Sequence, residues 1–416
     1  MIETSQDLPL WAHLIRVLAV FLFFLAGTGL LTWGERRLLG RMQARLGPNR
    51  IGPLGVGQFL MDAVKMLFKE DVTPGMVNRP LFRLAPLIGV VAAITSMAVI
   101  PISGPLEIGG YIFPLQVADL GVGVLWVLAI GSIHVYGLFL AGWSSNSPYP
   151  LIGGVRSSAQ MISYEIAQGL AVASVFIYVG SLRVSDIVNA QAGDGLWAGM
   201  PGWFVVPLFP AFVVFLVGMV AEAGRTPFDL AEAEGELVGG FVTEYSALRF
   251  GLFMIAEFMG AITQSAIMVT LFFGGPSGPT FGLEGTAAGL LGFVWFALKT
   301  LFFVFFFILL RGALPRYRYD KLMELGWKIL IPIALVWTMV TAVFVLLAEQ
   351  GGLATEARVG LAVGAVLILA LLLFVRPKGD DDAPSDPAST DRSRDIDTPA
   401  HTVAPPADST TTGRNG

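Results

Sequence analysis

The chain has 416 residues, of which 55% are hydrophobic and only 14% charged, with a net charge of −5 and a mean hydropathy of +0.71. Soluble domains hold about 45–50% apolar residues, so this composition excludes an ordinary water-soluble protein. Cysteine is absent, and the histidines are only His13, His134 and His401. The chain alone therefore cannot build a disulfide, a thiolate-bound zinc or iron–sulfur site, or an intramembrane bis-histidine haem site, and we expect no metal and no nucleic-acid partner.

Uncharged apolar runs predict an all-α polytopic membrane protein with about nine transmembrane helices. The expected spans are residues 13–33, 81–101, 119–142, 157–180, 204–221, 248–273, 288–310, 328–348 and 356–375. Basic residues gather on one side, in loops 34–80, 143–156, 222–247 and 311–327. The opposite loops and span ends hold only Arg16, Arg183 and Arg358. By the positive-inside rule, the N-terminus is expected outside and the C-terminus in the cytoplasm.

The first inner loop contains an amphipathic segment, VGQFLMDAVKMLFKE, which predicts an interfacial helix over about residues 54–70. Its apolar residues alternate with Asp62, Lys65 and Lys69 at helical spacing. Such a helix lies in the headgroup region with its charges toward lipid headgroups or protein. From these residues alone, a simple membrane-surface anchor is the plainer interpretation.

Acidic residues inside and beside the spans are the first functional candidates, because charges within a bilayer are costly. Glu165 and Glu257 fall within expected spans, and neither has a basic residue close by in the sequence. At an effective dielectric of 20, two carboxylates about 6 Å apart repel by roughly 2.8 kcal/mol, so a close cluster must share protons. The alternative is that each glutamate pairs with an arginine. His134 is interpreted as a hydrogen-bonded core histidine rather than a relay.

The acidic inner loop 222–247 reads AEAGRTPFDLAEAEGELVGG over residues 221–240. Arg225 and Arg249 are the only basic residues near seven acids, which are Glu222, Asp229, Glu232, Glu234, Glu236, Glu244 and Glu257. Asp229 has the D-x-x-E spacing of a capping box with Glu232, which predicts a short structured re-entry. Beyond Arg376 the chain becomes rich in Pro, Asp, Ser and Thr. We therefore expect one transmembrane domain over residues 1–375 and a disordered cytoplasmic tail over residues 376–416.

Four stretches carry a family resemblance: residues 34–70, 156–165 (RSSAQMISYE), 221–245 and 314–328 (LPRYRYDKLMELGWK). In order and spacing, over about residues 10–350, the chain resembles the H subunit of NADH–quinone oxidoreductase (respiratory complex I), the counterpart of mitochondrial NADH dehydrogenase subunit 1. The resemblance implies a component of an H⁺-translocating NADH:quinone oxidoreductase in the bacterial plasma membrane. Its partners would be quinone, the lipid bilayer, and the peripheral-arm and membrane-arm subunits, with FMN and iron–sulfur clusters held by the partner subunits.

The resemblance also implies roles for individual residues. Arg36, Asp62 and Ala63 would line or flank the quinone tunnel, and Arg316 and Arg318 would face partner subunits. The glutamate-rich proton path would comprise Glu165, Glu222, Glu232, Glu234, Glu244 and Glu257. No catalytic acid is assigned to this chain, because the donors for quinone reduction are expected on neighbouring subunits.

The chain departs from the family pattern at Phe258, where the family usually has tyrosine beside the preceding glutamate. A hydroxyl relay at that point would need water or another residue. Two rival classes stay open on the sequence: a stand-alone proton-coupled transporter using the same buried acids, and the homologous subunit of a membrane-bound hydrogenase. The sequence leaves ubiquinone and menaquinone equally open.

Overall fold

The computed structural model describes residues 9–108, 111–193, 202–229 and 238–349. This part contains seven helical segments long and apolar enough to cross a membrane and one shorter apolar helix, α7 (Phe209–Glu222). The long segments are α1 (Leu10–Met42), α3 (Arg79–Ser96), α4 (Gly123–Ser144), α5 (Pro148–Val179), α9 (Ala247–Phe272), α10 (Gly285–Ala313) and the continuous run of α11 (Tyr319–Glu324), η4 (Leu325–Leu330) and α12 (Ile331–Glu349). The predicted all-α polytopic fold is confirmed, while the ninth expected span and the tail lie outside the described residues.

Smaller elements connect the long helices. The expected interfacial segment contains the turn η1 (Pro53–Gly55) and the helix α2 (Gln58–Phe68). A short antiparallel hairpin, β1 (Leu106–Ile108) and β2 (Tyr111–Phe113), pairs Leu106 with Phe113. The remaining connections carry η2 (Met97–Val99), α6 (Val184–Gln191) and η3 (Gly240–Val242). The hairpin and α6 were not expected from the sequence, because three-residue strands and a two-turn helix leave little periodic signal.

Three expected helix boundaries differ most from the structure. The first span was expected to end at residue 33, but α1 continues to Met42 and carries Glu35 and Arg36 on its last turns. The fourth was expected to begin at residue 157, but α5 begins at Pro148, a proline suited to a first helical turn, and ends against Gly180 in the left-handed region. The eighth begins at Tyr319 rather than residue 328. Apolar content marks the part of a helix within the bilayer, and these helices extend beyond it.

Neighbouring helices approach closely through glycines. A Cβ at Gly137 of α4 would lie 3.1 Å from the carbonyl of Ala85 and the nitrogen of Gly89 on α3. A Cβ at Gly142 would lie 2.4 Å from the carbonyl of Pro150 on α5. Small residues at such crossings let backbones touch, which is how membrane helices gain van der Waals contact where lipid offers no hydrophobic driving force. Helices α3, α4 and α5 therefore form a tightly fitted set.

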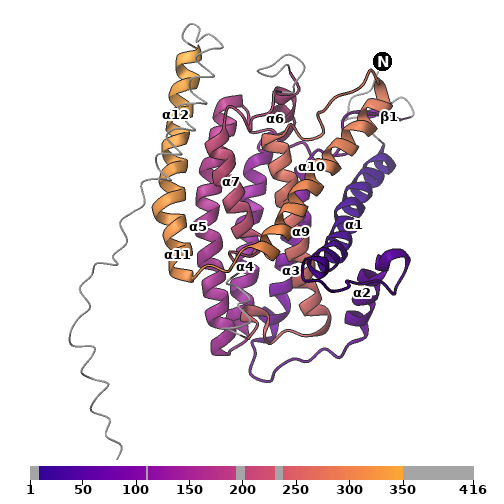
Figure 1. Ribbon diagram of the computed structural model, residues 1–416, viewed down its shortest axis with the longest axis vertical. Coiled ribbons are helices and arrows are strands. Elements are labelled where there is room, and N and C mark those ends of the chain that lie inside the picture. The colour runs from indigo at the N-terminus through magenta and orange to yellow at the C-terminus, as the bar shows by residue number, and fades with distance from the viewer. Residues whose placement is uncertain (1–8, 109–110, 194–201, 230–237, 350–416) are drawn as a thin grey trace, which may run out of the picture. The chain divides into compact units, whose positions relative to one another are not determined.

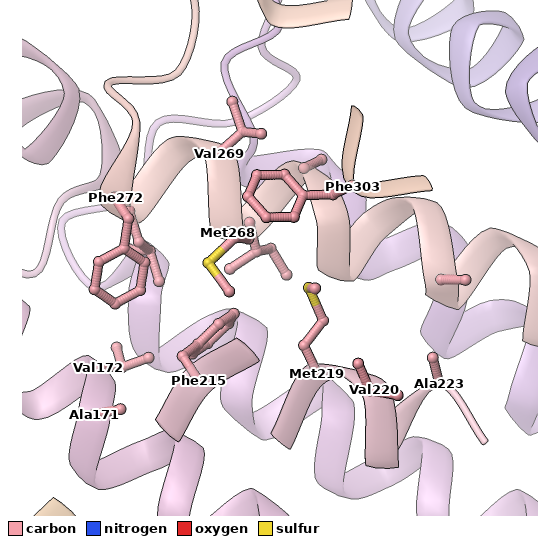
Figure 2. Packing of buried hydrophobic residues seen from close by; sticks show 14 of the residues in the cluster. Ala171, Val172, Phe215, Met219, Val220, Ala223, Met268, Val269, Phe272 and Phe303 are labelled. Atoms are coloured by element: carbon pink, nitrogen blue, oxygen red, sulfur yellow. The ribbon is translucent and has the colours of Figure 1, made fainter. Parts of the chain in front are cut away.

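The main core lies between α5, α7, α9 and α10. Figure 2 shows Phe215 and Met219 of α7 facing Met268 of α9 and Phe303 of α10. In Figure 1, α12 lies against α5 at one edge of the helices, and α1 and α2 lie at the opposite edge. This packing fixes α7 and α9, the helices that carry Glu222 and Glu257, in the middle of the domain.

Candidate functional site

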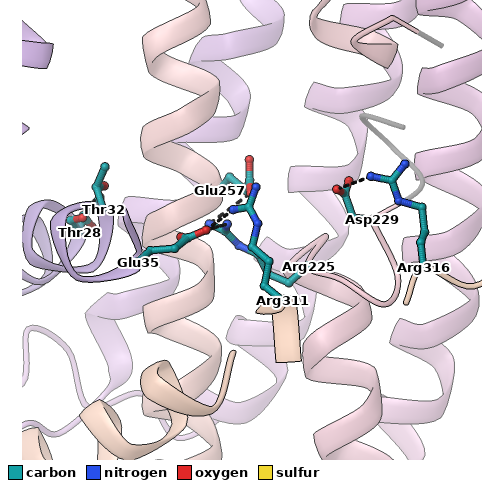
Figure 3. A network of polar contacts seen from close by, with 8 residues as sticks. All are labelled: Thr28, Thr32, Glu35, Arg225, Asp229, Glu257, Arg311 and Arg316. Atoms are coloured by element: carbon teal, nitrogen blue, oxygen red, sulfur yellow. Dashed lines mark hydrogen bonds and ion pairs between the residues drawn. The ribbon is translucent and has the colours of Figure 1, made fainter. Parts of the chain in front are cut away.

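Two carboxylates and two guanidinium groups meet in one cluster (Figure 3). Glu35 comes from α1, Glu257 from α9, Arg311 from α10, and Arg225 from the segment after α7. Nη1 of Arg225 lies 3.2 Å from Oε1 of Glu35, and its Nη2 lies 3.2 Å from Oε1 of Glu257. Arg311 also pairs with Glu35. The side chains of Arg225 and Glu35 are only 6% and 7% exposed, so their charges are desolvated and depend on each other.

The segment that carries Arg225 is held from two sides. Nε2 of Gln160 on α5 donates to the carbonyls of Ala221 (2.9 Å) and Phe228 (2.8 Å), and so clamps both ends of the segment. The guanidinium carbon of Arg225 lies 4.4 Å from the ring centre of Phe258. Phe258, where the family pattern has tyrosine, therefore provides an aromatic face for the arginine that pairs with Glu257.

A second pair of acids lies between α4, α5 and α7. Glu165 of α5 accepts a hydrogen bond from the hydroxyl of Ser132 on α4, and Glu222 ends α7. A Cβ built on Gly131 would lie 3.4 Å from Oε1 of Glu222 and 3.7 Å from Oε1 of Glu165. The two oxygens are thus at most about 7 Å apart, and at an effective dielectric of 20 two such charges would repel by about 2.4 kcal/mol. This pair fits the expectation that neighbouring carboxylates share protons.

Three cavities in the described part of the domain have these acids in their walls. The wide cavity, about 740 Å³, is bordered by Glu35, Arg36, Arg225, Glu257 and Arg311. The middle cavity, about 100 Å³, includes Glu257, Glu222 and His134 in its wall. The deep cavity, about 40 Å³, includes Glu222 and Glu165. Glu257 thus borders both the wide and the middle cavity, and Glu222 borders both the middle and the deep one.

Tyr245 forms part of the wall of the wide cavity. Its ring stacks on Phe82 with the centroids 4.0 Å apart, and its hydroxyl lies 3.4 Å from Oγ of Ser144. Burial raises the pKa of Tyr245 to about 12. The phenol therefore keeps its proton at neutral pH, and its hydrogen-bond partner in the structure is Ser144.

The expected quinone-site residues lie at the α1–α2 end of the wide cavity. Arg36 borders this cavity and forms an ion pair with Asp62, which also accepts a hydrogen bond from Nε2 of Gln58 at 3.1 Å. Ala63 is exposed on α2. Phe59 of α2 packs so closely on α1 that a Cβ at Gly29 would lie 2.7 Å from its ring. Helix α2 is thus docked beside the cavity, with Arg36 the one expected tunnel residue in its wall.

The other expected site residues are less closely joined to these cavities. Glu244 is half-buried before α9 and is not among the residues that line them. Glu232 and Glu234 lie outside the described residues. Asp229, expected to cap a helix, pairs with Arg316 at 3.1 Å, while Arg318 is strongly exposed. His134 has its Nδ1 3.3 Å from the carbonyl of Gly89, as expected for a hydrogen-bonded core histidine.

Sequence reasoning missed Glu35 and Arg311 as parts of the site. Glu257 has no basic residue close by in the sequence, but in the structure Arg225 pairs with it, as in the alternative left open above, and Arg311 brings a second positive charge to the cluster. A signal for Glu35 was present: an isolated acid next to a pair of arginines, directly after an uncharged apolar run, must find a partner if the helix continues. Within the described residues, no group of three or more His, Cys, Asp or Glu side chains is arranged to hold a metal ion.

The fold and the site define a multi-pass membrane protein with carboxylate-lined internal cavities. A family model described as NADH dehydrogenase matches residues 15–342. A protein from Frankia casuarinae, named as the H subunit of NADH-quinone oxidoreductase, is 48% identical over 374 residues, covering 89% of this chain and 81% of that protein. Its counterpart of the same name from Frankia alni is 47% identical over 369 residues, covering 88% and 80%. The chain therefore belongs to the NADH dehydrogenase family.

Proposed function

We propose that this chain, within the NADH-quinone oxidoreductase to which its family membership assigns it, forms part of a quinone cavity and passes protons from it into the membrane domain. The observation that carries the proposal is the series of three cavities in which Glu257 borders the first two and Glu222 the last two. Relatives named as the H subunit of that oxidoreductase, nearly half identical over most of the chain, support the assignment.

The wide cavity fits the task of binding a quinone head group. Its volume of about 740 Å³ lies within the range of about 300–1,000 Å³ typical of small-molecule sites. Its wall combines apolar surface from Met254 and Phe258 with the donor Arg36. Reduction of a quinone to a quinol consumes two electrons and two protons. The chain has no cysteine to ligate an iron–sulfur cluster, so the electrons would come from partner subunits.

The acids fit the task of proton transfer because neighbouring carboxylates cannot all be charged at once. Glu222 and Glu165 are close enough to repel strongly, and Glu257 is balanced by Arg225. A change of charge in the wide cavity would alter the balance of the cluster of Glu35, Arg225, Glu257 and Arg311. That change would reach Glu257 directly, and Glu222 and Glu165 through the middle and deep cavities.

Orientation and partner contacts complete the proposal. The basic loops favour an outside N-terminus and a cytoplasmic tail in a bacterial plasma membrane. Arg318 is exposed and is proposed to face peripheral-arm subunits together with Arg316, whose partner within the chain is Asp229. Peripheral and membrane-arm subunits, lipid and quinone are the proposed partners.

The test replaces each path acid by glutamine in membranes that contain the whole complex. Glu165→Gln, Glu222→Gln and Glu257→Gln should each lower quinone reduction and proton translocation by at least tenfold, because a positioned proton-transfer group contributes about 10²–10⁴-fold. NADH–ferricyanide activity, which bypasses the quinone, should persist. Glu284→Gln, exposed at the start of α10, is the matched control and should behave as wild type.

Normal proton translocation in all three variants would refute the path. An active protein isolated without flavin and iron–sulfur partners would instead support the rival transporter class.

A further inference from the structure

Glu222 differs from the other path acids in its polar neighbours. Glu257 has an arginine partner, and Glu165 has the hydroxyl of Ser132. Beside Glu222 lie two primary amides, Gln168 of α5 and Gln264 of α9. The neighbours that distinguish Glu222 are therefore neutral groups that can both donate and accept hydrogen bonds.

The two amides are built into the wall between the cavities. Gln264 and Glu222 border both the middle and the deep cavity, while Gln168 borders the deep one. Gln168 is only 2% exposed. A Cβ at Gly218 of α7 would lie 2.4 Å from Cγ of Gln168, so the absence of a side chain at that position makes room for the glutamine.

The amides also have unused hydrogen-bonding capacity. Nε2 of Gln168 and Oε1 of Gln264 are buried and make no close, well-aligned hydrogen bond among the described protein atoms, although both amides lie within reach of the Glu222 carboxyl. A buried polar atom left without a partner costs about 1–3 kcal/mol, so such atoms normally meet water or a titrating neighbour. Both cavities exceed the roughly 10–15 Å³ that one water needs, and both have polar groups in their walls.

A primary amide suits an acid that changes its protonation state. Its NH₂ group donates to an ionised carboxylate, and its carbonyl oxygen accepts from a protonated carboxyl. Rotation of the amide plane exchanges the positions of its NH₂ group and its carbonyl oxygen. A lysine or arginine would offer only donors and would hold the acid in its charged form.

We propose that Gln168 and Gln264 are positioning residues that hold Glu222 in both protonation states and order the water linking it to Glu165 and Glu257. The inference rests on the proposed function. It identifies the two side chains that allow Glu222 to accept a proton and pass it on. On either side of Glu222, the proton is carried by water and carboxylate oxygens, and the amides release none of their own.

The test uses Gln168→Met and Gln264→Met in the assembled complex, because methionine keeps the length of glutamine and removes both hydrogen-bonding groups. Quinone reduction per assembled complex should fall about tenfold to hundredfold, the range expected for losing a hydrogen bond to a charged group. The solvent deuterium isotope effect on that rate should rise, since proton transfer becomes limiting. Gln264→Asn, which retains the amide, should recover part of the rate if Gln264→Met assembles poorly.

A structural role would give a different pattern, and Gln191→Met provides that comparison. Gln191 is fully buried, bonds to backbone atoms of Thr270 and Gly274, and does not itself line any of the three cavities. Its loss should reduce assembly, lowering NADH–ferricyanide and quinone activities together without changing the isotope effect. Wild-type rate and isotope effect in assembled Gln168→Met and Gln264→Met complexes would overturn the inference. If Glu222→Gln also kept the wild-type rate, the proposed path itself would fail.

Discussion

Replacing Arg225 by glutamine should expose how strongly the buried cluster holds α1 and α9 together. The substitution removes a guanidinium that lies 3.2 Å from oxygens of both Glu35 and Glu257. At that distance and an effective dielectric of 20, each pair is worth about 5 kcal/mol before desolvation. Breaking a buried pair from one side typically costs about 3–5 kcal/mol net. Because Arg311 still pairs with Glu35, the lower end of that range is expected.

The interaction free energy between Arg225 and Glu257 can be measured with a double-mutant cycle of Arg225→Gln and Glu257→Gln. Once Glu257 is neutral, losing Arg225 leaves one fewer unpaired charge, so the double variant should be more stable than the sum of the two single effects. We expect a coupling of about 2 kcal/mol, equivalent to about thirtyfold between rate constants. The assay is the rate at which the complex dissociates on heating membranes at a fixed temperature, followed by native gel. If the effects of the two single substitutions on the dissociation rate constant simply multiply in the double variant, Arg225 and Glu257 do not interact. That result would refute the cluster.

Three further predictions concern single residues. Arg36→Ala should weaken binding of quinone-site inhibitors severalfold, as seen in inhibitor titrations of quinone reduction, and an unchanged titration would remove Arg36 from the site. Gly131→Ala should assemble normally, because its new Cβ would meet Glu222 at an ordinary 3.4 Å. It should still slow quinone reduction by occupying space between two carboxylates, and wild-type kinetics would contradict that. Gly142→Ala should lower the amount of assembled complex sharply, because its Cβ would lie 2.4 Å from a carbonyl oxygen. Gly169→Ala, with nothing within 4 Å, is the control, and equal assembly of the two variants would refute the close helix contact.

The sequence was a good guide to the helices and a poor one to their ends. Uncharged runs of about 20 residues place a helix in a bilayer with little ambiguity, so each span expected within the described residues corresponds to a helix. The ends of α1 and α5 were missed because both helices continue into polar surroundings, where apolar content no longer reports helix. The β1–β2 hairpin was missed because its strands are only three residues long.

The site was predictable as a list of acids but not as a set of pairs. The free-energy cost of placing a charged side chain within a bilayer pointed directly to Glu165 and Glu257. It could not show that Glu257 has an arginine partner, because Arg225 approaches through a turn after α7 rather than along the same helix. Glu35 and Arg225 are 190 positions apart, and periodicity carries no information over such a separation. Gln168 and Gln264 gave no signal, since neutral side chains do not stand out in a composition analysis.

The separation of the three cavities has a consequence for energy conservation. A continuous column of water through a membrane domain would let protons flow back down their gradient and dissipate the free energy of that gradient. Here Glu257 borders both the wide and the middle cavity, and Glu222 borders both the middle and the deep one. If protons follow the proposed path, they cross between these cavities only as often as the two glutamates exchange a proton. Back-leakage would then be limited by the same groups that carry the forward current, so coupling efficiency and turnover rate would be set at the same two residues.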